Sequence, residues 1–122
     1  MKVSTGIDLV EIDRVRDAIG RHGEKFVQRI FTPEEHRACA GRVASLAARF
    51  AAKEAAAKAL GCGIGDVSWQ EIEVMGDENN APHLVLHGFA EKMAHELGYV
   101  QWSVSLSHTH EHALAVVVMS GS

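Results

Sequence analysis

The sequence predicts an α+β fold in which an antiparallel sheet packs against one long helix. Residues 42–60 are rich in alanine, leucine, lysine and glutamate, the residues of highest helix propensity. Residues 3–9 form a short apolar run, and the apolar residues of 68–76 alternate, which is typical of strands. Because helices and strands occur in runs and do not alternate strictly, an antiparallel sheet backed by helices is favoured over a parallel sheet.

The first half of the chain is predicted to be one strand followed by helices. These elements are expected at residues 3–9, 10–19, 24–31, 33–41 and 42–60. Thr32, Pro33 and Glu35 have the spacing of a helix start, with a cap, a proline at the first position and a capping-box acid. Gly61 stands where a glycine commonly ends a helix, so it closes the long one.

The second half is predicted to contain four strands and one helix. The strands are expected at residues 68–76, 83–88, 101–107 and 112–119, with a turn at 77–82 and a helix at 89–98. The apolar residues of 69–74 alternate, while Phe89, Met93 and Leu97 follow a helical stripe. The last two strands are joined through residues 108–112.

The totals favour one domain, residues 1–122, in the cytoplasm. Twelve basic residues against sixteen acidic ones give a net charge of −4, which argues against general nucleic-acid affinity. No segment approaches the roughly 20 apolar residues of a membrane span, and the N-terminus is not a signal peptide. Cys39 and Cys62 have no CxxC spacing, so reduced thiols are expected.

Two acidic residues on different predicted elements are candidate site residues. Asp8 lies at the end of the first predicted strand, where the chain turns into a helix, and Glu54 lies within the long helix. An acid at a strand end is suited to a cleft. An acid near a helix N-terminus also caps that helix, so position alone leaves both interpretations open for Asp8.

The long helix carries three cations around a single acid. Arg49 and Lys53 are i,i+4 neighbours, and Glu54 has Lys58 at i+4. A solvated helix with a Glu54–Lys58 ion pair, which contributes about 0.2–0.5 kcal/mol, explains this pattern. A site for phosphate and a divalent cation is the alternative explanation, since Mg²⁺ takes one or two carboxylates together with substrate phosphates.

Two further clusters carry charge or metal-ligating groups. His108, His110 and His112 alternate, but structural zinc needs four ligands, so contact of His108 with an anionic ligand is favoured over a metal site. Residues 13–29 contain five cations and three acids. They form either a solvated face or a docking strip for an acidic partner, in which Arg14, Arg21 and Lys25 would align on a continuous helix.

Four segments of the chain are distinctive when taken together. They are "GIDLVEIDRV" at 6–15, "RIFTPEE" at 29–35, "ARFAAKEAAAKALGCGIG" at 48–65 and "VSLSHTHEHALAVVV" at 104–118. They resemble the bacterial holo-acyl-carrier-protein synthases, which are small 4′-phosphopantetheinyl transferases. The resemblance implies transfer of the phosphopantetheine arm of coenzyme A to a serine of apo acyl carrier protein, in fatty acid biosynthesis. It also implies a phosphopantetheinyl-transferase-like fold and a homotrimer with active sites at the subunit interfaces.

The same resemblance implies roles for individual residues. Asp8 and Glu54 would hold Mg²⁺, with Mn²⁺ as the alternative, and Lys58 would stabilise or protonate the departing phosphate. The coenzyme A site would consist of Arg49, Lys53, Lys58, Gly61 and His108. Arg14, Arg21 and Lys25 would meet the acid-rich carrier protein. The resemblance leaves open which group takes the serine proton: Glu54, Asp8 through a metal-bound water, or water alone.

Two alternatives belong to other functional classes. A non-catalytic binding module for an acidic partner would use the basic segment and would need neither Asp8 nor Glu54. A magnesium-dependent nucleotide hydrolase would use the same carboxylates, but it would ordinarily carry a denser cluster of acids than the sequence has around Glu54.

Overall fold

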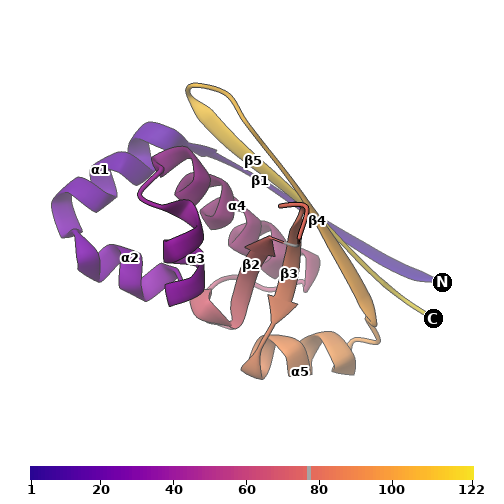
Figure 1. Ribbon diagram of the computed structural model, residues 1–122. Coiled ribbons are helices and arrows are strands. Elements are labelled where there is room, and N and C mark those ends of the chain that lie inside the picture. Colours follow the sequence, from indigo (N-terminus) through magenta and orange to yellow (C-terminus); the bar gives the residue numbers. More distant parts are fainter. Residues whose placement is uncertain (77) are drawn as a thin grey trace.

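The computed structural model describes residues 1–76 and 78–122. The strands are β1 (Lys2–Glu11), β2 (Ile72–Gly76), β3 (Pro82–Leu86), β4 (Gln101–His108) and β5 (His112–Gly121). The helices are α1 (Ile12–His22), α2 (Glu24–Ile30), α3 (Pro33–Cys39), α4 (Val43–Ala59) and α5 (Gly88–Glu96), with a 3-10 turn η1 (Trp69–Glu71) (Figure 1). None of the helices in these ranges is long and apolar enough to cross a bilayer.

The main sheet is antiparallel, with strand order β1-β5-β4, and α4 packs against it. In Figure 1 the sheet lies on one side of α4, while α1, α2 and α3 lie on the other. Strands β2 and β3 form a separate antiparallel pair, and α5 connects β3 to β4. The predicted α+β class, with an antiparallel sheet against a long helix, is confirmed.

The alanines of α4 are explained by how closely other elements approach it. Ala51, Ala52, Ala55 and Ala56 are fully buried. A Cβ atom placed on Gly6 of β1 would lie 1.9 Å from the backbone oxygen of Ala55, so the two backbones are in direct contact. Small side chains on α4 and a glycine on β1 therefore bring the strand against the helix, and this distance positions the groups described below.

Several element boundaries differ from the predictions for local reasons. Strand β1 extends to Glu11 because it pairs with β5 over its whole length, and α1 therefore starts at Ile12. The strand predicted from residue 68 starts only at Ile72, because Ser68 caps the 3-10 turn η1. Helix α3 begins with the predicted capping box but ends at Cys39, before a left-handed residue. The predicted turn at 77–82 includes Asp77, which lies outside the described residues.

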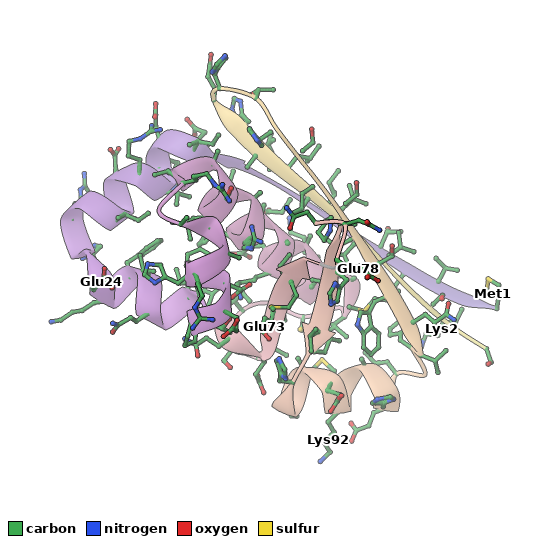
Figure 2. All side chains as sticks on the ribbon, viewed as in Figure 1. Met1, Lys2, Glu24, Glu73, Glu78 and Lys92 are labelled. Atoms are coloured by element: carbon green, nitrogen blue, oxygen red, sulfur yellow. The ribbon has the colours of Figure 1, made fainter. Side chains whose placement is uncertain are left out.

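Two lysines next to or on α5 have different surroundings. Lys2 donates to the backbone oxygen of Leu97 at 2.5 Å and lies over the ring of Tyr99, which ties the N-terminus to the end of α5. Lys92 projects from α5 away from the rest of the chain (Figure 2). Its side chain is 68% exposed, which makes it a suitable position for control substitutions.

Candidate active site

Asp8, Glu54 and Lys58 are brought together on one cavity. Asp8 lies on the side of β1 that faces α4, and Glu54 precedes Lys58 by one turn of that helix. The ammonium of Lys58 donates to the carboxylate of Asp8 at 3.1 Å and to the backbone oxygen of Ile7 at 3.0 Å. All three side chains line a cavity of about 530 Å³, together with Arg14 of α1. Lys58 is therefore paired with Asp8 across elements in this structure.

The surroundings of Glu54 raise the pKa of its carboxyl group. Burial raises the pKa of this carboxyl group, the nearby Asp8 carboxylate raises it further, and Lys58 opposes the change. Two neighbouring carboxylates supply hard oxygen donors, the kind that Mg²⁺ and Mn²⁺ take. No group of three metal-ligating side chains occurs among the described residues, so a cation here would depend on Asp8 and Glu54. This donor set fits Mg²⁺, which usually keeps waters and substrate oxygens as its other ligands.

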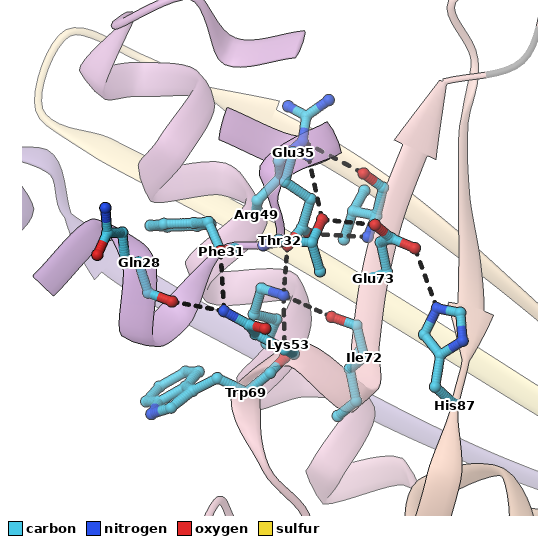
Figure 3. Close-up of polar contacts among 12 residues, drawn as sticks. Gln28, Phe31, Thr32, Glu35, Arg49, Lys53, Trp69, Ile72, Glu73 and His87 are labelled. Carbon is cyan, nitrogen blue, oxygen red and sulfur yellow. Dashed lines mark hydrogen bonds and ion pairs between the residues drawn. The ribbon is translucent and has the colours of Figure 1, made fainter. Parts of the chain in front are cut away.

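The structure corrects the prediction for Lys53. Its side chain is fully buried and its ammonium contacts Glu35 at 2.8 Å, rather than facing a ligand at the surface. The backbone oxygens of Trp69 and Ile72 accept two further hydrogen bonds from the same group (Figure 3). The i,i+4 spacing of Arg49 and Lys53 places them on neighbouring parts of α4. The spacing alone does not show which of the two cations is buried by other elements.

Arg49 lies on a second cavity, of about 510 Å³. Arg37 of α3 and Arg42, which precedes α4, line the same cavity, and the sequence analysis identified neither. Among the residues that the structure describes, no side chain that lines this cavity also lines the cavity of Asp8 and Glu54. The sequence signal for this cavity was the position of Arg42 immediately before the alanine-rich helix. The proximity of Arg42 to Arg37 could not be predicted, because it depends on how α3 packs.

The other predicted ligand-binding residues, His108 and Gly61, line neither of these two cavities. His108 ends β4 and lines a cavity of about 430 Å³ with Arg16 and His110. Gly61 has a φ of 79° and donates its backbone N–H to the oxygen of Lys58, so it directly follows the end of α4 that carries the site. His112 opens β5 on the other side of the hairpin turn from His108.

The basic segment is divided between two helices. Arg14 and Arg21 lie on α1, but that helix ends at His22, and Lys25 follows Gly23 on α2. A continuous helix aligning all three is therefore absent over residues 12–30. Arg14 lines the cavity of Asp8, and Lys25 lines a neighbouring cavity of about 400 Å³ with Arg29. The two cavities share Phe26 and Phe50, so the cations adjoin one continuous surface.

Comparisons with known proteins agree with this geometry. Residues 4–117 match the family described as the 4′-phosphopantetheinyl transferase superfamily. The chain is 50% identical over 124 residues to a holo-[acyl-carrier-protein] synthase of Herpetosiphon aurantiacus, covering 96% of this chain and 98% of that protein. A synthase of the same name from Moorella thermoacetica is 46% identical, covering 98% and 95%.

The fold is also similar to solved structures. The Helicobacter pylori holo-[acyl-carrier-protein] synthase, crystallised in complex with coenzyme A, superposes with a TM-score of 0.88 at 35% identity, covering 95% of this chain and 99% of that one. The predicted resemblance is therefore confirmed over nearly the whole length of the chain. The chain belongs to the holo-[acyl-carrier-protein] synthases of the 4′-phosphopantetheinyl transferase superfamily.

Proposed function

We propose that this chain transfers the 4′-phosphopantetheine arm of coenzyme A to a serine of apo acyl carrier protein, in fatty acid biosynthesis in the cytoplasm. The observation that carries the proposal is the convergence of Asp8, Glu54 and Lys58 on one cavity beside the basic helix α1. The free thiols of Cys39 and Cys62 fit a reducing compartment. Residues 1–122 act as a single catalytic domain in this proposal.

The reaction requires one phosphorus–oxygen bond to form and another to break. The serine oxygen bonds to the phosphorus that carries the pantetheine, and adenosine 3′,5′-bisphosphate leaves with the electron pair of the broken bond. Lys58 is suited to neutralising or protonating the leaving phosphate, since its ammonium already faces carboxylate and backbone oxygens. Asp8 and Glu54 would hold Mg²⁺, or Mn²⁺, which when bound neutralises charge on the diphosphate.

The residues proposed to bind coenzyme A lie on two faces of the chain. Asp8, Glu54 and Lys58 line one cavity, whereas Arg49 lines another. A single coenzyme A can use both sets if one chain contributes the carboxylates and a neighbouring chain contributes Arg49, with His108 on the neighbour's side. A contact between two different surfaces closes into a ring when the rotation between neighbouring chains is one third of a turn, as in the homotrimer we propose.

An uncovered apolar face of the main sheet supports assembly. Val3, Ile7 and Leu9 of β1 and Val118 of β5 are each at least 37% exposed, and they lie on the side of the sheet opposite α4. A contiguous apolar face of this kind is typical of a surface that is buried in an oligomer.

The carrier protein is proposed to approach along α1 and the start of α2. Arg14, on the wall of the carboxylate cavity, would meet an acidic residue close to the acceptor serine. Arg21 on α1 and Lys25 on α2 would contact the carrier protein further from the cavity. They lie on two separate helices and do not align on one helix face. Exposed cations of this kind mainly raise the rate of encounter with an acidic partner.

Intact-mass spectrometry of a bacterial apo acyl carrier protein tests the proposal. The carrier is incubated with this protein, coenzyme A and Mg²⁺, in parallel with samples containing EDTA, the Glu54→Ala variant, or the control variant Glu91→Ala on the exposed part of α5. We expect a mass increase of one phosphopantetheine arm with the wild type and the control only. A folded, coenzyme-A-binding protein that modifies none of several carriers would overturn the proposal in favour of the non-catalytic binding module.

A further inference from the structure

Three ionisable side chains cover the edge of strand β2 that faces away from β3. The backbone oxygen of Ile72 accepts a hydrogen bond from Lys53 at 2.5 Å. The backbone N–H of Val74 donates to the Glu35 carboxylate at 2.9 Å, and its oxygen accepts from Arg49 at 3.4 Å. Side chains from α3 and α4 therefore take the place of a neighbouring strand on this edge (Figure 3).

Glu35 and Lys53 form the closed centre of this arrangement. Both side chains are 0% exposed and their charged groups are 2.8 Å apart. Glu35 also accepts from the backbone N–H of Thr32 at 2.9 Å, and Lys53 also donates to the backbone oxygen of Trp69 at 3.0 Å. All buried side-chain nitrogen and oxygen atoms in the described part of the chain have a hydrogen-bond partner. Burial lowers the pKa of Lys53, and the adjacent Glu35 opposes that change.

The elements joined by this pair form the walls of the arginine cavity, which we define by Arg37, Arg42 and Arg49. Helix α3 supplies Arg37, α4 supplies Arg49, Arg42 lies immediately before α4, and the end of β2 supplies Met75 and Gly76. A buried ion pair is often no more stabilising than an apolar pair of the same size, so its charges need another explanation than stability. Directional contacts to three walls provide one, because they fix the spacing of the guanidinium groups.

We propose that Glu35 and Lys53 are positioning residues that hold the arginine cavity in the geometry that receives the phosphate groups of the nucleotide portion of coenzyme A. The inference rests on the proposed function, because that function supplies the anion. Neither residue touches the substrate. Removing either should loosen the cavity by separating β2 from α3 and α4, while the carboxylate cavity and the surface of α1 keep their own contacts.

The experiment compares binding and turnover in the full-length protein. Wild type, Glu35→Gln, Lys53→Met and the milder Lys53→Arg are assayed for the Kd of adenosine 3′,5′-bisphosphate by calorimetry, and for kcat and both KM values. Val117→Ala is the control, because Val117 is fully buried in the main core and does not line the arginine cavity. It should lower stability without changing nucleotide affinity.

We expect Glu35→Gln and Lys53→Met to raise the bisphosphate Kd and the KM for coenzyme A about 10-fold, which is less than the roughly 100-fold loss that a 1 Å misplacement of reacting groups can cause. The KM for the carrier should change less than about twofold, and Lys53→Arg should recover part of the loss because it keeps the charge. If the wild type binds the bisphosphate and folded variants bind it equally well, the positioning inference is wrong. If the wild type neither binds it nor transfers the arm, the proposed function itself fails, and the inference fails with it.

Discussion

The ammonium of Lys58 lies 3.1 Å from the carboxylate of Asp8 and joins the end of α4 to the middle of β1. Helix α4 also carries Glu54, so the same contact sets the separation of the two carboxylates proposed to hold the cation. The distance between β1 and α4 is in turn set by Gly6, which has no side chain to keep them apart. The geometry of the candidate site thus depends on one close contact between a strand and a helix.

Gly6→Ala should destabilise the protein by about 3 kcal/mol, because its new methyl group overlaps the backbone oxygen of Ala55. Urea denaturation measures this change. Gly20→Ala is the matched control: nothing lies within 4 Å of its added Cβ, and alanine is the better helix former, so that variant should be as stable as the wild type or more stable. Equal stability of the two variants would contradict the close packing of β1 on α4.

Lys58→Met should lower kcat about 100-fold, because it removes a positive charge proposed to act on the departing phosphate. The KM for the carrier protein should be unchanged, since Lys58 lies on α4 and not on the α1 surface. Steady-state assays with coenzyme A and apo carrier measure both constants. Lys92→Met, at the exposed position on α5, is the control and should behave as the wild type. A kcat within a few-fold of the wild type would remove Lys58 from the mechanism.

Arg14→Glu should raise the KM for the carrier protein about 10-fold at low salt, and much less at 0.5 M salt, because exposed charges are screened by ions. The KM for coenzyme A should stay constant. Lys92→Glu makes the same change of charge on a distant helix and should leave both constants unaltered (Figure 2). Carrier kinetics of Arg14→Glu that match the wild type at low salt would contradict docking along α1.

The stability contributed by Glu73 should depend on pH. Burial raises the pKa of this carboxyl group, but hydrogen bonds from Thr32 and His87 outweigh burial and hold the pKa below its ordinary value. The ionised form is therefore favoured in the folded state. Its contribution is complete above the unfolded pKa of about 4.3 and is lost as the pH falls through the lower folded pKa.

Glu73→Gln should accordingly be less stable than the wild type by about 1–2 kcal/mol at pH 7, and the difference should shrink towards pH 3. Urea denaturation at several pH values measures the difference. His87→Ala removes one of the two donors and should reproduce part of the loss at pH 7. A stability difference that is constant from pH 7 to pH 3 would show that the Glu73 charge is not involved.

Sequence patterns predicted the parts of this fold that depend on local chemistry. The capping box of Thr32 and Glu35 is local to the start of α3, and the length of α4 follows from helix propensity. The second role of Glu35 was not predictable in the same way. Its carboxylate meets Lys53 and β2 only after α3 and α4 have packed, and no short-range pattern encodes that contact.

The sequence likewise predicted only part of the candidate site. Asp8, Glu54 and Lys58 were identified through the family resemblance, and their convergence depends on the contact between β1 and α4. Lys53 was placed in the coenzyme A site by the resemblance, whereas its burial against Glu35 depends on how α3 and α4 pack. The sequence shows a glycine at position 23, where α1 and α2 are separated. Only the structure shows that this break prevents Lys25 from aligning with Arg14 and Arg21.

A complementation assay tests most directly the central claim, that one transfer site is assembled from the Asp8 side of one chain and the Arg49 side of another. Differently tagged chains carrying Asp8→Asn or Arg49→Leu are co-expressed, mixed oligomers are isolated through both tags, and transfer is measured at coenzyme A concentrations below KM. Each variant alone should be nearly inactive. In a trimer that contains both kinds of chain, one of the three interfaces joins an intact Asp8 side to an intact Arg49 side, which predicts recovery to about one third of wild-type activity. Mixed oligomers no more active than either variant alone would contradict the shared site.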